Sequence, residues 1–219
     1  MAEIFDFKKE YKDLYLLKTT PGIIEVPEML FIHVHGEGNP NTSQEYSNAV
    51  EILYGLSYTI KMSKKSGTPP QGYFEYVVPP LEGLWWSVLE ADNHHDGKTV
   101  IDKDKLRWNS MIRQPDFVTH EVFEEAKHIL HKKKPELDLS LASLAKWNEG
   151  LCAQIMHVGS YDDEPLTIEI LEKFIKESGY RNDISQARKH HEIYLNDPRK
   201  TAPEKLKTVI RHPIAKAVL

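Results

Sequence analysis

An internal repeat constrains the fold of this chain more than any other feature, because both halves present the same kinds of segment in the same order. The first half has strand-like or helical segments, in chain order, at residues 32–36, 44–61, 74–78 and 106–112. The second half has matching segments, again in chain order, at residues 155–159, 165–178, 191–195 and 206–210. The sequence therefore predicts two strand-helix-strand-strand modules in one pseudo-symmetric domain, and the seam between such modules is a natural ligand groove.

Composition and charge argue against several classes of protein. Of the 219 residues 40% are hydrophobic, which is enough for a substantial core, and the net charge of −5 does not favour nucleic-acid binding. The lysine run at 132–134 is interpreted as the solvated end of a helix. The single cysteine, Cys152, excludes an intrachain disulfide and is expected to be a buried strand thiol.

Neither a targeting signal nor a membrane span is predicted. The N-terminal residues lack the charged and apolar regions of a signal peptide. No apolar stretch approaches the roughly 20 residues that cross a bilayer. We therefore expect a soluble, cytoplasmic protein that does not bind nucleic acid directly or associate with membranes.

The segment at 44–61 has the pattern of an amphipathic helix. Thr42 is the expected N-cap, and Glu45, three residues later, completes a capping box. One face of the segment is mostly apolar and consists of Tyr46, Ala49, Val50, Leu53, Ser57 and Ile60. This face is expected to pack on a sheet.

Two further helices have clear boundary signals. Pro165 marks the start and Gly179 the end of the helix in the second half. The predicted packing face of this helix consists of Thr167, Ile170, Leu171 and Phe174. A third helix at 119–134, ended by Pro135, is predicted to connect the two modules.

The first module alone carries an insertion at 80–90, which is predicted to form an extra strand before a turn at 92–97. In the matched strands at 74–78 and 191–195, Glu75 is the expected repeat counterpart of Glu192. A symmetric groove could hold both carboxylates.

Three segments resemble the GyrI-like small-molecule-binding family, which includes the effector domain of multidrug-binding transcription regulators and the DNA gyrase inhibitory proteins. They lie at 147–150, 157–165 and 191–198, and the motif Glu192-Ile193-Tyr194-Leu195 is the most specific part. The resemblance implies an α+β fold in which the duplicated modules form one antiparallel sheet, with helices on one face and a central ligand groove between the helices. It places an N-terminal extension at 1–20 and a GyrI-like domain at 21–219, with repeat one at 21–118 and repeat two at 147–214.

Two departures from the regulators refine this resemblance. Residues 1–20 leave no room for a DNA-binding helix-turn-helix, so a stand-alone effector fold is expected. Residues 84–86, 106–108 and 111–119 resemble a stand-alone subgroup in which some members hydrolyse cyclopropane-containing DNA-alkylating antibiotics inside an aromatic cage.

Glu192 and Tyr194 lie two apart on a predicted strand and therefore share a face. In an apolar cavity, the carboxylate could attract a cationic ligand, or its pKa could be raised by desolvation so that it holds and deprotonates a water molecule. The resemblance implies a functional acid at Glu192, with Tyr194 beside it. The alternative is a surface carboxylate on a half-exposed strand.

Aromatic side chains are the candidate ligand-binding residues. Trp85 and Trp86 are adjacent on a predicted strand, so they point to opposite faces and at most one of them lines a given pocket. Together with Trp108 they could contact a flat polycyclic ligand, or they could simply pack in the core. Tyr54 and Tyr58, one helical turn apart, could line the edge of the groove or lie on the helix surface.

No metal site or cofactor is expected. Histidines recur in pairs, but none of the pairs forms a recognised ligand set with cysteine or carboxylate; the pairs are His33 and His35, His94 and His95, His128 and His131, and His190 and His191. The sequence also lacks a glycine-rich phosphate loop.

Two functions are consistent with these residues. The first is a detoxifying hydrolase in which Glu192 directs water at the strained ring of a cyclopropane-bearing compound held between aromatic side chains. The second is a non-catalytic protein that binds or sequesters hydrophobic, often cationic, compounds in the same groove. Contact with a protein partner such as gyrase is a third possibility and rests on family analogy alone.

Overall fold

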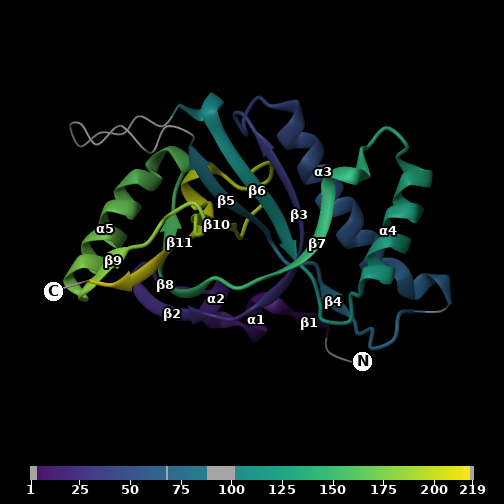
Figure 1. Cartoon of the computed structure of the whole chain (residues 1–219), viewed down its shortest axis with the longest axis horizontal. Helices are drawn as coiled ribbons and strands as arrows, with labels where there is room; N and C mark the ends of the chain where they lie inside the picture. Colours follow the sequence, from purple (N-terminus) through teal and green to yellow (C-terminus); the bar gives the residue numbers. More distant parts are fainter. Residues whose placement is uncertain (1–3, 68, 88–101, 218–219) are drawn as a thin grey trace. The chain divides into compact units, whose positions relative to one another are not determined.

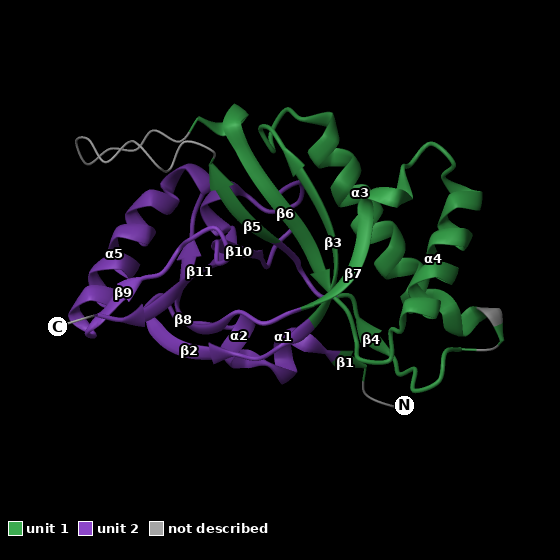
Figure 2. Ribbon diagram, viewed as in Figure 1, with its two compact units in different colours: residues 1–5, 30–78, 83–146 green, residues 6–29, 79–82, 147–219 purple. Residues whose placement is uncertain are grey.

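The computed structural model describes residues 4–67, 69–87 and 102–217, which belong to two compact units (Figures 1 and 2). Unit 1 consists of Met1–Phe5, Leu30–Val78 and Gly83–Lys146, and unit 2 of Asp6–Met29, Pro79–Glu82 and Trp147–Leu219. Each unit combines antiparallel strands with α-helices, so the predicted α+β class is confirmed. The predicted turn at 92–97, with His94 and His95, lies outside the described residues.

The strands of unit 1 follow the order β5 (Leu81–Ser87), β6 (Leu106–Arg113), β3 (Met29–Glu37) and β7 (Ala142–Trp147). Strands β3 and β6 are antiparallel, with Ile32 opposite Ile112 in the middle of the pair. Both of these side chains have no exposed surface, so the centre of the pair is core.

The segment at 74–78 does not form the strand of the first module that was predicted to match 191–195. Only β4 (Tyr76–Val77) forms there, and it pairs with β1 (Phe5–Asp6) in a separate two-stranded sheet. Strand β5 lies next to β6, just as β10 (His190–Tyr194) lies next to β11 (Lys207–Lys216). The predicted insertion therefore supplies the module's own strand, and Glu75 is not the structural counterpart of Glu192.

The physical reason lies in length and burial. The run at 81–87 forms a seven-residue strand whose central positions 82–85 are all buried, and it can therefore bury apolar surface on both faces. In the run at 74–78 the side chains of Phe74 and Val77 are exposed, so this shorter run buries less apolar surface as a strand.

Helix α3 (Gln44–Lys61) begins one residue later than its predicted cap implies. Ser43 has extended backbone angles, and its Oγ accepts a hydrogen bond from the N–H of Tyr46. The predicted N-cap at Thr42 is therefore wrong. Glu45 does not complete a capping box either, because its carboxylate accepts from the N–H of Glu37 on β3.

Helix α3 packs against β6 and against α4 (His120–Lys133). Its buried side chains are Ala49, Ile52, Leu53, Leu56, Ser57 and Ile60. A Cβ placed on Gly55 would lie 2.9 Å from Leu130 Cδ2, so the missing side chain lets α4 approach closely. The helix predicted at 119–134 is confirmed as α4, with Thr119 as its N-cap.

The strands of unit 2 form an antiparallel array in the order β2 (Gly22–Val26), β8 (Gly150–Val158), β11 and β10. The short strand β9 (Tyr180–Asn182) pairs with the last residues of β11. Cys152 on β8 is fully buried, as the sequence predicts for a strand thiol.

Helix α5 (Glu164–Glu177) packs against β8 and β9. Leu171 and Ile175 project from the helix into the core of unit 2, whose other members are Ala153, Ile155, Ile210 and Ile214. Each fully buried aliphatic side chain contributes about 1.5–3 kcal/mol. Ile170 is 53% exposed, so its predicted place on the packing face is wrong.

The N-terminal residues 7–15 add two short helices to unit 2, α1 (Phe7–Glu10) and α2 (Lys12–Tyr15), and these bury Phe7, Leu14 and Tyr15. The other short helices are η1 (Met62–Ser66), η2 (Lys103–Lys105), η3 (Leu139–Leu141), η4 (Tyr161–Asp163) and η5 (Pro203–Lys205). In the part of the chain that the structure describes, no helix has the length and apolar character of a membrane span.

Candidate functional site

Strand register brings the candidate catalytic residues together on the α5 face of unit 2. His190, Glu192 and Tyr194 alternate along β10, so their side chains share one face. Across the pair, Glu192 lies opposite Ile210, and Ile210 belongs to the core that α5 covers. The prediction that Glu192 and Tyr194 lie side by side is confirmed by a direct contact, described next.

The carboxylate of Glu192 has a partner on each oxygen. Oε1 lies 2.8 Å from His190 Nε2, and the hydroxyl of Tyr194 donates to Oε2 over 2.6 Å. The Glu192 side chain is only 15% exposed. It is therefore a positioned group and not the freely solvated carboxylate of the alternative interpretation.

The environment lowers the pKa of Glu192. Burial by itself raises this pKa, but hydrogen bonding and the charge of His190, together with hydrogen bonds from Tyr194 and Glu164, outweigh burial. The hypothesis that desolvation raises the pKa of Glu192 is therefore wrong in sign. At neutral pH the group is an ionised carboxylate, able to accept a proton or to face a cation.

Two further groups border the Glu192 carboxylate at the start of α5. Glu164, the first residue of the helix, is buried and hydrogen-bonds to Glu192. The ring of Tyr161 on η4 meets the ring of Tyr194 edge to face, with centroids 5.8 Å apart. Burial and the charges of Glu164, Glu192 and Asp197 raise the pKa of Tyr161 to about 12, so its phenol keeps its proton.

Thr208 supplies an unused polar atom in the same region. It lies opposite Tyr194 on β11, it is 1% exposed, and its hydroxyl has no hydrogen-bond partner among the described residues. A buried hydroxyl without a partner is energetically unfavourable, so a bound water or ligand atom at this position would be stabilised.

A second set of polar residues continues from Glu192 in the other direction. His190 Nδ1 lies 2.7 Å from His212 Nε2, and His212 Nδ1 lies 2.7 Å from Glu172 Oε1 on α5. Asn182 on β9 also donates to Glu172 Oε1, over 2.5 Å. The side chain of Glu172 is 40% exposed, so this chain of contacts leads from Glu192 towards solvent.

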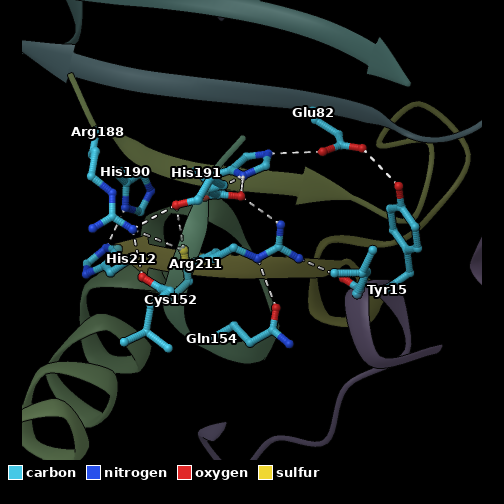
Figure 3. A network of polar contacts seen from close by, with 12 residues as sticks. Tyr15, Glu82, Cys152, Gln154, Arg188, His190, His191, Arg211 and His212 are labelled. Atoms are coloured by element: carbon cyan, nitrogen blue, oxygen red, sulfur yellow. Dashed lines mark hydrogen bonds and ion pairs between the residues drawn. The ribbon is translucent and has the colours of Figure 1, made fainter. Parts of the chain in front are cut away.

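The opposite face of β10 and β11 carries a buried ionic network (Figure 3). His191 lies between two carboxylates, with Nδ1 3.0 Å from Glu149 and Nε2 3.1 Å from Glu82. Arg211 Nη1 pairs with Glu149 over 3.0 Å, and Tyr15 donates to Glu82 over 3.3 Å. This network connects the N-terminal segment, β10 and β11 within unit 2.

The candidate aromatic residues all lie in unit 1. Trp108 has no exposed surface and Trp85 is 9% exposed, and both rings contact Tyr46, at centroid distances of 5.1 and 5.7 Å. Trp86 is partly exposed, in line with its position on the other face of β5. Trp108 and Trp85 therefore contribute to the packing of unit 1.

Tyr54 and Tyr58 stack on each other along α3, with centroids 6.3 Å apart, and Tyr58 is 51% exposed. Their role at the edge of a groove, like the groove that would combine the aromatic residues with Glu192, remains a prediction.

The sequence interpretation missed His190, His212 and Glu172 as partners of Glu192. Alternation along the strand gives one usable signal, since His190 precedes Glu192 by two residues and must share its face. His212 and Glu172 give no such signal, because their positions depend on strand pairing and on the packing of α5.

The structure describes no group of three or more His, Cys, Asp or Glu residues that could hold a metal ion, within the residues that it covers. Burial, and secondarily the nearby charge of Glu149, raise the pKa of Cys152, so its thiol is not an activated nucleophile.

Comparison with known proteins places the chain among small-molecule-binding proteins. Residues 145–215, which include Glu192 and Tyr194, match the GyrI-like small molecule binding domain. The crystal structure of a hydrolase from Listeria innocua is 47% identical, with a TM-score of 0.86, over 96% of this chain and the whole of that chain. An uncharacterized conserved protein from Listeria innocua is 49% identical, with a TM-score of 0.88 and the same coverage.

A more distant structure shares the fold. The C-terminal domain of EcmrR is 12% identical, with a TM-score of 0.52, over 90% of this chain and 98% of that domain. No curated protein matches the sequence significantly. The family match over the Glu192 region and the two Listeria innocua relatives, each covered over its full length, show that the chain belongs to the GyrI-like small-molecule-binding family.

Proposed function

We propose that this protein binds hydrophobic xenobiotics and hydrolyses the cyclopropane ring of cyclopropanoid DNA-alkylating agents, as a detoxifying enzyme. The observation that carries the proposal is the Glu192 carboxylate, ionised and held between Tyr194 and His190. A carboxylate base of this kind can deprotonate a water molecule without help from a bound metal ion. The 47% identical hydrolase from Listeria innocua supports the reaction class.

The proposed reaction adds one water molecule to the ring. Glu192 takes a proton from water while the water oxygen bonds to a ring carbon. The strained carbon–carbon bond breaks, and its electron pair moves onto the conjugated acceptor of the agent, which takes a proton from solvent. The hydroxyl oxygen of Tyr194 can accept a hydrogen bond from the water while its proton is donated to Glu192.

Aromatic side chains have the proposed role of holding the flat ligand. Trp86, which is partly exposed, is the strongest candidate, and the exposed ring of Tyr58 is the next. The fully buried Trp108 is better suited to supporting their position than to touching ligand. A Trp86→Phe variant should therefore weaken ligand binding, whereas Trp108→Phe should mainly lower stability.

Incubation of the purified protein with a cyclopropanoid alkylating agent tests the reaction. The expected product, detected by mass spectrometry, is the ring-opened alcohol, which is one water heavier than the agent. Glu192→Gln should lower kcat by about 100-fold or more. The matched control is Glu169→Gln, because Glu169 is an exposed carboxylate on helix α5. This variant should retain activity. No acceleration over buffer by the wild type would exclude the hydrolase.

A non-catalytic binding function is the second candidate, and the lowered pKa of Glu192 favours it for cationic ligands. An ionised carboxylate beside the rings of Tyr194 and Tyr161 suits an organic cation. Calorimetric titration distinguishes this function, because Glu192→Gln should weaken cations far more than neutral ligands of the same shape. Equal effects on both would show that Glu192 does not contact the ligand.

A further inference from the structure

A continuous hydrogen-bonded chain joins Glu192 to the surface of unit 2. It runs from Glu192 to His190 over 2.8 Å, from His190 to His212 over 2.7 Å, and from His212 to Glu172 over 2.7 Å. His212 is 3% exposed, whereas the side chain of Glu172 is 40% exposed. The side chains of His190 and Glu192 are 18% and 15% exposed, so Glu172 is the most exposed member of the hydrogen-bonded chain.

Neighbouring donors define the direction of the bond at Glu172. The N–H of Ile184 donates to Asn182 Oδ1 over 2.8 Å, which orients the amide so that Nδ2 donates to Glu172 Oε1. The same oxygen lies 2.7 Å from His212 Nδ1. Asn182 Nδ2 also lies 3.2 Å from His212 Nδ1, but the shorter contact of Nδ1 is with Glu172, whose pKa is lowered despite burial by the hydrogen bond and charge of His212. An ionised carboxylate can only accept, so His212 carries a proton on Nδ1.

The hydrogen-bonded chain holds one more proton than two neutral imidazole rings supply. Three hydrogen bonds need three protons, but two neutral imidazoles carry only two. Burial lowers the pKa of His212, so this ring is neutral; it donates from Nδ1 to Glu172 and accepts at Nε2 from His190. The third proton therefore lies between His190 Nε2 and Glu192.

We propose that Glu192, His190, His212 and Glu172 form a proton relay that carries the proton taken up by Glu192 to solvent. This inference rests on the proposed hydrolytic function, in which Glu192 accepts a proton from water. The chain already holds one proton for each of its hydrogen bonds. When Glu192 gains a proton, one proton shifts from His190 Nδ1 to His212 Nε2, one from His212 Nδ1 to Glu172, and Glu172 releases one to water. Reorientation of the two imidazoles then turns an unprotonated nitrogen of His190 towards Glu192, which passes it the proton and is ionised again. His190 and His212 act through Glu192 and are positioning residues.

Several other titratable groups face the relay. Glu164 and Tyr194 hydrogen-bond to Glu192, and Tyr161 lies within electrostatic reach of Glu192. Asp197 acts on Tyr161 and so lies at the same end of the relay. These groups sit at the Glu192 end, so substitutions at Glu172 probe the relay without removing a group that contacts the reacting water.

Steady-state kinetics of the full-length protein with a cyclopropanoid agent test the relay at its surface end. Glu172→Gln keeps an oxygen that accepts from His212 but cannot take up a proton. We expect kcat to fall roughly tenfold with KM unchanged and with a larger solvent deuterium isotope effect. Glu169→Gln, on the same helix, should leave all three values unchanged. A Glu172→Gln variant with the kcat and isotope effect of the wild type would overturn the relay while leaving the hydrolase intact.

Nitrogen-15 NMR of the imidazoles tests the relay independently of turnover. We expect His212 to be neutral with its proton on Nδ1, and we expect Glu192→Gln to shift the His212 resonances. The charge of Glu192 also acts on His212 directly, and the same substitution in a His190→Gln background, which lacks the connecting imidazole, measures that direct effect. His157, which bonds Thr167 and the carbonyl of Ser160, is the internal control and should not respond. Unchanged His212 resonances in Glu192→Gln would overturn the relay, whereas a wild type with coupled imidazoles and no turnover would overturn only the hydrolase.

Discussion

Arg211 Nη1 lies 3.0 Å from Glu149 Oε2 in the interior of unit 2, where the two side chains are 0% and 6% exposed. Arg211 also donates to Gln154 over 2.9 Å and to the carbonyl of Leu14 over 3.0 Å. A buried ion pair of this kind contributes little net stability over an apolar pair, but the loss of one partner leaves an uncompensated charge.

Removing the negative charge of Glu149 should therefore destabilise the protein strongly. Glu149→Gln leaves Arg211 and His191 without their shared counter-ion, and we expect the free energy of unfolding to fall by about 3–5 kcal/mol. Urea denaturation followed by circular dichroism measures the change. Glu204→Gln, an exposed carboxylate in the same unit, should change stability by less than about 0.5 kcal/mol. A similar loss in both variants would contradict the structural role of the network.

Stability should also fall as pH rises above neutrality. Burial alone lowers the pKa of His191, but the charge of Glu149, the hydrogen bond to Glu149 and the nearby carboxylate of Glu82 raise it from 6.5 to about 9. Because the folded pKa is the higher one, the stabilisation is fully present below pH 6.5 and is lost as pH rises through about 9. The loss should be on the order of 3 kcal/mol.

Urea unfolding across this pH range provides the measurement, and His191→Gln is the diagnostic variant because it should remove most of the slope. The interaction of Glu149 with His191 and Arg211 also contributes stability that is lost in acid. Burial alone raises the pKa of Glu149, but the charges of His191 and Arg211 lower it to about 2, so this stabilisation is lost as pH falls from 4.5 to about 2. A wild type equally stable at pH 6.5 and about 9 would refute the assignment of His191 as a buried cation.

Loss of the Tyr194 hydroxyl should raise the pKa of Glu192. The hydroxyl donates over 2.6 Å to the ionised form, and a hydrogen bond to a charged group is worth about 1.5–3 kcal/mol, or roughly one to two pKa units. Carbon-13 NMR titration of the glutamate carboxyls in Tyr194→Phe measures the shift. Tyr180→Phe, on β9 of the same unit, should leave the Glu192 titration in place. A pKa that does not rise would mean that the bond contributes nothing in solution.

Gly36 should not tolerate a side chain. It lies opposite Trp108 in the pairing of β3 with β6, and a Cβ at this position would overlap the Trp108 ring and the Glu45 carboxylate. We expect Gly36→Ala to lower stability by about 1–3 kcal/mol. Gly22→Ala is a matched control on strand β2, because a Cβ there meets no atom within 4 Å. Thermal unfolding compares the two, and equal melting temperatures would contradict the close packing of Trp108 against β3.

Local patterns were enough to predict the main helices and the pairing of side chains along single strands. The periodicity of apolar residues located α3, α4 and α5 to within one or two residues, because a helix face is set by backbone geometry alone. Alternation likewise placed Glu192 beside Tyr194. Predictions failed where two local patterns competed, as at the Thr42 and Ser43 caps and at the strands 74–78 and 81–87.

What the sequence by itself determined is thus the three main helices, the duplication, and the presence of a carboxylate and a phenol on one strand face. Only the tertiary structure decided which strand completes the first module, which groups contact Glu192, and in which direction its pKa moves. The physical reason is that His212 and Glu172 lie far from Glu192 along the chain. Cross-strand register and the packing of α5 bring them into one hydrogen-bonded chain, and neither is encoded in the spacing of neighbouring residues.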